Sequence, residues 1–524
     1  MPAQVGRPRL FLRNSTGLVR EVGPLTALLM NIAFIAFQSG FLLLLSSMFN
    51  FPMGNPIIAI ALSAALFLPL AVLLNRVGIT YYRTASDYLF VSRNLNPAVG
   101  FASMLMFTID QMFFNAVLIS LGLVTGLAPA LMAIGLANNE HYLVLLSNEL
   151  SSNPLLIFLL GIAIFAILIL INALSIRAGK YLASTLSLFG ILTFILTITL
   201  TYTYSHQILT TINNASPGLL MKANNVAREL PTYGPVLDTV FLIPYLAYVF
   251  PFINFVLSIG GEVRRGKSIP LAIYGTYTIS AVILMISTWL VLSSIGINHI
   301  NGLFAIYYGV APSITYPGTL PPPYPQALLI LVIKNPVLQW LIAIGSFLWY
   351  VGMVSVLVIQ IARYILALSF DRVLPSILAY VNPRTHTPIA AHLIDLAVTS
   401  IIMYLYNFSV VPLLSATMDI STLVTILMYF MIITITTIAL GLRVRSIGTT
   451  ALGIYTTALF AWMAYEEAVN PMAYLFTPSI NAYIIGFFAL IFIAGLIAFH
   501  AMRIYRLRRE GVDLNVVFRE IPPE

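Results

Sequence analysis

The stretch FLIPYLAYVFPFINF, residues 241–255, decides how this chain must fold. It is apolar enough to lie in a bilayer, yet it contains Pro244, Pro251 and Asn254. Each proline removes a backbone donor and frees a carbonyl upstream, so an unbroken helix is disfavoured there. Within a bilayer, such a break is tolerated only against protein or a water-filled cavity. The stretch therefore predicts a discontinuous membrane helix beside a cavity.

A second break signal lies near the N-terminus. The stretch NIAFIAFQSGF, residues 31–41, places polar Gln38, Ser39 and Gly40 in the middle of an apolar run. The two stretches fall in the first and sixth predicted spans. That spacing is expected if spans 1–5 and 6–10 are inverted repeats with two further spans appended. A proline in one membrane helix is usually a simple kink, but two corresponding breaks favour a binding site.

The composition excludes a large soluble enzyme. Of 524 residues, 60% are apolar and 8% are charged, against about 25% charged in a soluble domain. The absence of cysteine excludes disulfides, Fe–S clusters and thiol catalysis. The six histidines lack zinc-ligand spacing, so we expect no metal site. No phosphate loop appears, and we expect no cofactor and no nucleic acid partner.

Twelve apolar runs approach or exceed the roughly 20 residues needed to cross a bilayer, which predicts an all-α membrane protein of twelve transmembrane helices. The runs lie near residues 24–48, 57–75, 98–126, 154–174, 179–203, 237–260, 270–295, 337–368, 388–408, 414–442, 448–465 and 480–502. The predicted organisation is an N-terminal tail (1–23), a first repeat (24–203), an external loop (204–236), a second repeat (237–442), spans 11 and 12 (443–502) and a C-terminal tail (503–524).

The cations predict the orientation. If the N-terminus is cytoplasmic, all of the 25 Lys and Arg except Lys222, Arg228 and Lys334 fall in inside segments. The positive-inside rule then predicts a multi-pass protein of the cell membrane with both termini cytoplasmic. The basic ends are also placed to contact anionic lipid headgroups. The proline-rich external stretch at 312–326 favours stiff extended backbone, either as a lid or as an ordered loop.

The chemistry expected at the two breaks suits a zwitterion. A half-helix starting near Ser39 and Gly40 would point free N–H groups and a positive dipole end at a carboxylate. The freed carbonyls of residues 247–250 would accept hydrogen bonds from an ammonium group. An amino acid satisfies both ends at once.

Two cytoplasmic stretches resemble motifs of the amino acid–polyamine–organocation (APC) superfamily of transporters. GGEVRRGKSIPLAI (260–273) is similar to the E-V-(K/R)-N-P-x-x-x-I-P-x-A-I signature after span 6. ARYILALSFDRVLPSILAYVNPRTHTPIAAHLI (362–394) resembles the pattern after span 8. STLVTILMYF (421–430) and NALSIRAGKYLAS (172–184) look similar too. The motif residues are Glu262, Arg264, Arg265, Pro270, Arg363, Asp371 and Arg372. Of these, we expect Glu262 and Asp371 to pair with the neighbouring Arg264, Arg265 and Arg372.

This resemblance implies a leucine-transporter-like fold and alternating access around a site between spans 1, 3, 6, 8 and 10. It implies a secondary active transporter, an amino acid permease-like symporter rather than an enzyme, for an amino acid or related organic amine. Proton coupling is the leading expectation. The alternatives are sodium coupling or exchange on the same fold, or a non-transporting amino acid sensor with a degenerate site.

The chain departs from the family pattern at both breaks. Phe34 and Gln38 stand where span 1 usually has glycines, and Phe252 and Asn254 replace a glycine and a glutamate in span 6. Larger side chains there would shrink the pocket or change its ligand. Gly190 stands where some members carry a lysine in place of a sodium ion. The predicted substrate-binding residues are Ala36, Gln38, Ser39, Gly40, Asp110, Ala247, Tyr248, Phe250, Phe252 and Asn254.

Asp110 is an acid near the middle of span 3. Such an acid costs about 2.5–3.5 kcal/mol on insertion scales and usually faces a cavity or a partner. It is predicted either to carry the coupling proton or to balance a cationic substrate; a hydrogen-bonded tie between helices is the structural alternative. Asp419, near the outer end of span 10, is a candidate gate. Ser355 in span 8 is a possible sodium ligand, although hydroxyls often bond back to their own helix.

Overall fold

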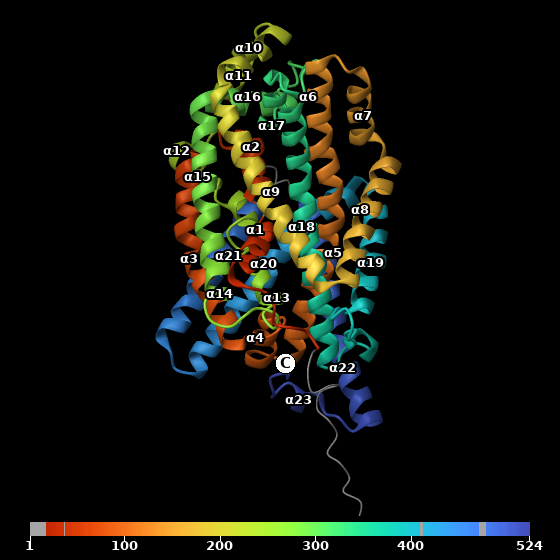
Figure 1. Cartoon of the computed structure of the whole chain (residues 1–524). Helices are drawn as coiled ribbons and strands as arrows, with labels where there is room; N and C mark the ends of the chain where they lie inside the picture. Colours follow the sequence, from red (N-terminus) through yellow and green to blue (C-terminus); the bar gives the residue numbers. More distant parts are fainter. Residues whose placement is uncertain (1–16, 36, 409–411, 471–477, 524) are drawn as a thin grey trace, which may run out of the picture.

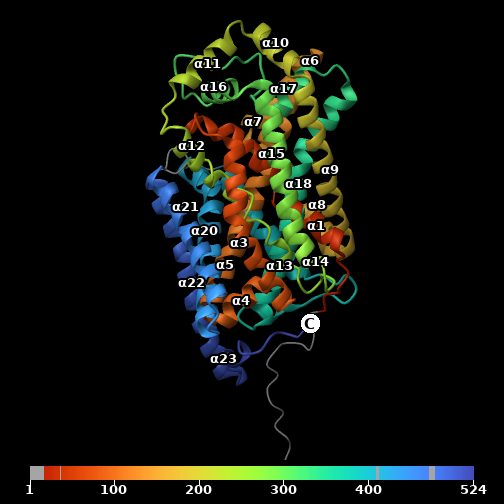
Figure 2. The ribbon, with the colours of Figure 1, turned by 90° about the vertical axis from the view of Figure 1, so that its left-hand side faces the viewer.

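The computed structural model describes residues 17–35, 37–408, 412–470 and 478–523, with the backbone alone for 412–426, 478–482 and 484. Its helices stand side by side in an upright bundle, as Figures 1 and 2 show from two directions. Within the described residues, the extended segments form two isolated bridges, between Val22 and Val263 and between Thr84 and Ile259. The protein is therefore an all-α bundle, as predicted.

The first half of the chain forms α1 (Pro24–Ile35), α2 (Phe37–Ser47), α3 (Pro56–Tyr81), α4 (Ser86–Asn94), α5 (Pro97–Leu121), α6 (Ala128–Asn138), α7 (His141–Ser152), α8 (Pro154–Leu174), α9 (Ile176–Thr203), α10 (Ser205–Ala215) and α11 (Leu219–Glu229). The second half forms α12 (Pro235–Phe241), α13 (Phe255–Ser258), α14 (Ser268–Pro270), α15 (Thr276–Ile295), α16 (Ile297–Tyr307), α17 (Pro325–Val332), α18 (Pro336–Phe370), α19 (Ile389–Asn407), α20 (Pro412–Arg443), α21 (Ile447–Val469), α22 (Pro478–Glu510) and α23 (Leu514–Val517). Short 3₁₀ turns are η1 (Met48–Asn50), η3 (Pro244–Tyr248) and η5 (Ser376–Ala379), and wider π-helical turns are η2 (Gly122–Leu127) and η4 (Leu271–Gly275).

Ten helices in the described part of the chain are long and apolar enough to cross a membrane. The sixth predicted span contains the shorter apolar helix Pro235–Tyr248, and the tenth contains α20, whose side chains are described from Leu427 onward. Each of the twelve predicted runs thus falls on helical structure in the described part of the chain. The sixth is short because the prolines of the 241–255 stretch interrupt it.

Four of the long helices begin with the same N-terminal capping motif. In each, an asparagine caps the helix and a proline takes the first helical position, where its missing N–H costs nothing. The asparagine side chain accepts the N–H groups of the residues two and three positions ahead. The pairs are Asn55–Pro56 in α3, Asn96–Pro97 in α5, Asn153–Pro154 in α8 and Asn335–Pro336 in α18.

The predicted break in the sixth span is present, since this span divides into α12, the 3₁₀ turn η3 and the short α13. In the first span, α1 is described to Ile35 and α2 from Phe37, and residue 36 lies outside the described residues. The break expected in the first span therefore stays a prediction. The two spans touch, because a Cβ atom on Gly40 would overlap the Val249 side chain. Glycine at position 40 is what lets α2 pack this closely on the interrupted sixth span.

The two ends of the bundle differ. The short helices α10, α11, α16 and α17 gather at one end, and α4, α23 and the C-terminus lie at the other (Figure 1). The N-terminal segment is at the α4 end as well, since the Val22 N–H bonds to the Glu262 carbonyl. Between α16 and α17, residues 308–324 form no helix, as the proline-rich sequence there predicted.

Candidate functional site

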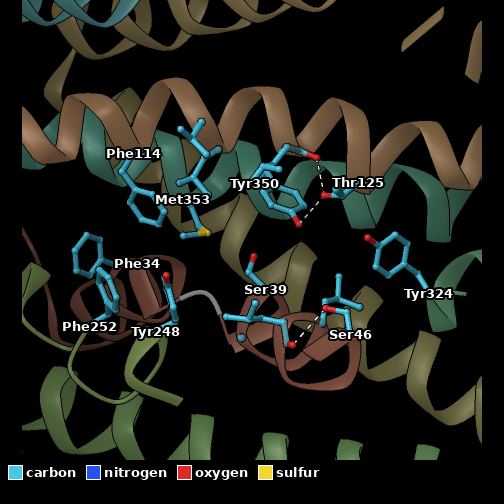
Figure 3. A pocket seen from close by; sticks show the side chains of 16 residues that line it. Phe34, Ser39, Ser46, Phe114, Thr125, Tyr248, Phe252, Tyr324, Tyr350 and Met353 are labelled. Atoms are coloured by element: carbon cyan, nitrogen blue, oxygen red, sulfur yellow. Dashed lines mark hydrogen bonds between the residues drawn. The ribbon is translucent and has the colours of Figure 1, made fainter. Parts of the chain in front are cut away.

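A cavity of about 310 Å³ lies beside α2 and the break of the sixth span. This volume is at the small end of the range of about 300–1,000 Å³ for ligand pockets. Its walls come from α1, α2, α5, η2, η3 and α18, with Tyr324 at one end (Figure 3). The lining residues are Phe34, Ser39, Gly40, Leu42, Leu43, Ser46, Phe114, Val117, Leu118, Leu121, Thr125, Tyr248, Phe252, Tyr324, Tyr350 and Met353.

Three phenylalanines close one end of this cavity. The ring centroids of Phe34 and Phe252 lie 5.4 Å apart in an edge-on contact, and those of Phe114 and Phe252 lie 6.1 Å apart. Figure 3 shows the three rings gathered at the end opposite Tyr324. Phe34 and Phe252 are the residues that replace glycines of the family pattern. Both rings thus lie at the cavity wall, and the expectation that they shrink the pocket or change its ligand stays a prediction.

Hydroxyl groups supply the polar part of the wall. Ser39 faces Tyr350 across the cavity (Figure 3), and the hydroxyls of Tyr350 and Thr125 lie 3.1 Å apart. Thr125 belongs to the π-helical turn η2, a geometry that is frequent at functional sites. The turn packs tightly on α18, because a Cβ atom on Gly122 would lie 2.9 Å from the Tyr350 Cβ. The glycine thus lets η2 approach and position the Tyr350 ring.

The cavity continues toward the α16 and α17 end. A second hollow of about 690 Å³ is lined by α6, α7 and the proline-rich stretch, including Pro312 and Tyr316. Thr125 and Tyr324 line both hollows, so the two adjoin. A solute at the α16 end therefore has a short route to the cavity beside η3.

Four predicted binding residues, Ser39, Gly40, Tyr248 and Phe252, line the cavity. Four others are buried and lie outside its lining: Gln38, Ala247, Phe250 and Asn254. Phe250 instead contacts Phe67 and Tyr277, with ring centroids 6.2 and 5.2 Å away. The predicted residue Ala36 lies outside the described residues.

Asp110 is fully buried in α5, one helical turn before the cavity residue Phe114. Spacing of four residues places both on the same helix face. The Gln111 Nε2 donates to the Asp110 Oδ2 at 2.9 Å. Because Gln111 is the next residue of α5, this bond does not join two helices, and the alternative of a tie between helices stays a prediction. Asp110 lies behind the phenylalanine end of the cavity.

The other residues singled out from the sequence lie on α9, α18 and α20. Ser355 is buried, and its Oγ has no hydrogen-bond partner among the described residues. Gly190 packs directly against Trp349, whose ring occupies the space a side chain would need. The side chain of the candidate gate Asp419 lies outside the described residues.

Buried ion pairs close the α4 end of the bundle. Arg363 Nε lies 2.7 Å from Glu262 Oε1, and Lys180 Nζ lies 2.7 Å from Glu262 Oε2. Burial alone would raise the pKa of Glu262, but Arg363 and Lys180 hold it at about 2. This pair of contacts ties the loop after α13 to both α9 and α18.

A second buried acid is held in the same way. Asp371, at the end of α18, receives both guanidinium nitrogens of Arg93, at 2.6 and 2.8 Å, and the Tyr88 hydroxyl at 2.7 Å. Arg93 and Tyr88 belong to α4, so this contact joins α4 to α18.

The expected pairing of these acids with their sequence neighbours is wrong. Arg264 and Arg265 are exposed, and Arg372 pairs with Glu510 at 3.0 Å. The acids point into the protein and meet cations brought from distant helices, whereas the neighbouring arginines point toward solvent or the C-terminal segment.

A third buried acid, Asp87, lies in α4 and meets hydroxyl groups. The Tyr364 hydroxyl donates to its Oδ2 at 2.7 Å, and the Tyr429 hydroxyl donates to the same atom. The Tyr88 N–H donates to its Oδ1 at 2.9 Å. These bonds join α4 to α18 and α20.

The C-terminal segment covers this end. Phe518 is buried and lies under the Arg93 guanidinium, 4.6 Å from the ring centroid. Arg93 Nε also donates to the Glu520 carbonyl at 3.4 Å, and Arg83 Nε donates to the Pro522 carbonyl at 3.1 Å. The segment thus contacts the same arginine that holds Asp371.

Several of these residues were missed from the sequence. Asn31 in α1 donates to the carbonyls of Ile253 and Ala272 at 3.1 and 3.0 Å, and its Oδ1 accepts the Val256 N–H at 3.1 Å. A lone asparagine inside the apolar run of span 1 was a visible signal for such a tie. Tyr350 and Asp87 gave no comparable local signal.

Comparisons with known proteins gave one sequence family and one distant structural likeness. The sequence profile of a family described as amino acid permease matches residues 23–502. No curated protein matches the chain at a significant level. A solved structure of a Na⁺-coupled sialic acid symporter in a substrate-bound outward-open state is similar at a TM-score of 0.49 and 14% identity, over 88% of this chain and 91% of that chain. A likeness this distant assigns neither a substrate nor an ion.

Proposed function

The chain belongs to the amino acid permease family. We propose that it moves an amino acid or related organic amine across the membrane and that a proton gradient drives this transport. The family has the leucine-transporter-like fold, and the break of the sixth span at η3 matches it. The protein is thus a multi-pass secondary transporter, and its substrate, coupling ion and orientation are the proposed part.

The cavity beside α2 and η3 carries the proposal. On one side, if the first span is interrupted before Ser39 and Gly40 as we propose, the free N–H groups and positive dipole end of α2 would suit a carboxylate. On the other side, the N–H groups of Val249 and Phe250 both bond to the Leu246 carbonyl, and Pro251 has no N–H. The Ala247 carbonyl thus lacks its usual helical donor, which suits an ammonium group.

The wall indicates the class of side chain. None of the described residues that line the cavity carries a charge, and three phenylalanines close one end. A charged substrate side chain would lose hydration there without gaining a counter-charge. We therefore favour a zwitterion with an apolar side chain over a polyamine or a basic amino acid.

Asp110 is the proposed proton carrier. It is the buried acid on the cavity-facing side of α5, one turn from Phe114. Sodium coupling is the second candidate, and the buried Ser355 hydroxyl without a partner among the described residues favours it. Asp419 is retained as a proposed gate. We assign the α4 end to the cytoplasm, since the inside cations of the sequence gather there.

Uptake into proteoliposomes tests the proposal. Labelled apolar amino acids, basic amino acids and polyamines are supplied in turn under an imposed proton gradient and then a sodium gradient. We expect proton-driven accumulation of an apolar amino acid, loss of that accumulation in Asp110→Asn, and no loss in the exposed control Glu229→Gln. Unchanged proton-driven uptake by Asp110→Asn would reject Asp110 as the carrier, and uptake driven by sodium alone would support the second candidate.

A further inference from the structure

Three of the fully buried carboxyl groups toward the cytoplasmic end, Glu262, Asp371 and Asp87, differ in their partners. A fourth, Asp395 of α19, accepts from the Thr399 hydroxyl of its own helix at 2.9 Å. Glu262 and Asp371 each bind cations, Arg363 with Lys180 and Arg93 respectively. Asp87 binds two phenol hydroxyls and a backbone N–H, all of them neutral donors. A buried carboxylate without a cation is the most easily protonated kind.

The groups packed around Asp87 are accounted for on each neighbouring element. From α18, Tyr364 donates to it and in turn accepts from Gln360 Nε2 at 3.2 Å. From α20, Tyr429 donates to it, and Phe107 of α5 stacks on that ring with centroids 3.8 Å apart. The other acid of α5, Asp110, accepts from Gln111.

The remaining neighbours are engaged elsewhere. On α4 itself, Arg93 binds Asp371, and Tyr88 donates its hydroxyl to Asp371. At the end of α3, the Tyr81 hydroxyl accepts from Asn94, and Arg83 beyond it donates to the Pro522 carbonyl. Ser258 of α13 donates to its own helix. Burial raises the pKa of the Asp87 carboxyl, while hydrogen bonds from Tyr429 and Tyr364 partly offset that rise.

Protonation of Asp87 would change the number of bonds this cluster can form. The ionised Oδ2 accepts from Tyr364 and Tyr429 together. When a proton from solvent adds to that oxygen, the carboxyl becomes a donor, and one phenol must turn its own hydrogen away. The link from α4 to α18 or to α20 is then weakened, while the ion pairs of Glu262 and Asp371 are untouched.

We infer that Asp87 is a second proton-binding residue of this transporter, one that ties α4 to α18 and α20 when ionised and releases the cytoplasmic end when protonated. The inference rests on the proposed function, because it supplies a step at which protons act on the cycle. It differs from the role of Asp110, since Asp87 lies outside the substrate cavity.

Cysteine labelling tests this inference without substrate. The natural chain has no cysteine, so Ser258→Cys provides a single thiol at a buried position of α13, beside α4. The rate of its modification by a charged maleimide from the cytoplasmic side reports opening. In the Ser258→Cys protein that keeps Asp87, we expect the labelling rate to rise at least threefold as the pH falls. The pH at the midpoint of this rise should lie above the pKa of an exposed aspartate. In Asp87→Asn we expect a high rate that does not change with pH.

Two further variants keep the test decisive if Asp87→Asn is poorly folded. Tyr364→Phe and Tyr429→Phe each remove one donor to the ionised carboxylate, so the midpoint should move to higher pH by about one unit. Glu229→Gln, at the far end, should leave the profile unchanged. A pH-dependent rate that persists in Asp87→Asn, or a midpoint unmoved in both phenylalanine variants, would overturn the inference.

The same data separate this inference from the proposed coupling. If proton gradients drive no uptake while labelling still depends on Asp87, the proposal of proton coupling fails and the proposed role of Asp87 stands. If uptake is proton-driven while labelling is independent of Asp87, only the proposed role of Asp87 fails.

Discussion

The half of the bundle toward α16 and α17 and the half toward α4 are built from different chemistry. The first half is hollow, and its described wall is apolar apart from hydroxyls such as Ser39, Thr125 and Tyr350. The α4 half is filled, and buried charges such as Glu262 and Asp371 hold its helices together. An apolar wall can part from its contacts at small electrostatic cost, whereas a buried ion pair resists separation. The difference teaches that the helices around the cavity separate at lower electrostatic cost than the helices at the α4 end.

We call the buried ion pairs of Glu262 and Asp371 at the α4 end the lock. The largest expected effect comes from removing Glu262, its central acid. Glu262→Gln leaves the buried cations Arg363 and Lys180 without their counter-charge, so stability should fall by about 3–5 kcal/mol. Thermal unfolding in detergent measures it. The matched control is Glu21→Gln, which breaks the exposed pair with Arg177 and should change the melting temperature little. Equal effects of the two variants would contradict the lock.

Two neighbouring phenylalanines separate packing from selectivity. Phe252 lines the cavity, whereas Phe250 packs on Phe67 and Tyr277. Replacing either by alanine should cost about 3–5 kcal/mol of stability. Only Phe252→Ala should widen the cavity and strengthen competition by larger amino acids, by about tenfold per 1.4 kcal/mol gained. Competition against labelled uptake measures this, and the same selectivity change in Phe250→Ala would count against the assigned cavity.

The pH dependence of the lock follows from the low pKa of Glu262. Its folded value of about 2 lies below the ordinary 4.5. Its stabilising contribution is therefore fully present above pH 4.5 and is lost as the pH falls toward 2. The melting-temperature gap between the natural protein and Glu262→Gln should stay constant from pH 7 to 5 and shrink below about 4.5. A gap that already closes near pH 6 would show that the ion pairs do not hold this carboxyl ionised.

The smallest expected effect concerns the C-terminal segment. Phe518→Ala removes the ring under the Arg93 guanidinium, a contact of about 0.5–2 kcal/mol. Arg93 would then hold Asp371 less firmly, and labelling of Ser258→Cys should rise by severalfold at most. Phe518→Tyr, which keeps the ring, is the control. No change in Phe518→Ala would mean that this segment does not support the lock.

The break in the sixth span was predictable because its signal is local. Pro244 and Pro251 remove donors wherever they stand. The charge count predicted the membrane class for the same reason. The break expected near Ser39 and Gly40, and the narrower pocket or changed ligand expected from Phe34 and Phe252, stay predictions.

The lock was not predictable because its partners are far apart along the chain. Arg93 and Asp371 are separated by 278 residues, and Tyr429 and Asp87 by 342. Local spacing favoured pairing of the acids with adjacent arginines, and only tertiary packing decides that those arginines face outward. Tyr364 and Tyr429 resemble ordinary packing residues until their hydroxyls are seen on one carboxyl group.

Protection of a thiol at position 39 tests the central claim most directly, namely that the cavity lined by Ser39, Tyr248 and Phe252 binds the amino acid and is reached from outside the cell. In the cysteine-free chain, Ser39→Cys should react with a charged maleimide added from outside, and a saturating apolar amino acid should slow the reaction at least tenfold. The exposed control Ser293→Cys should react equally fast with or without it. Reaction at position 39 that no amino acid slows, or that occurs only from the cytoplasmic side, would contradict the account.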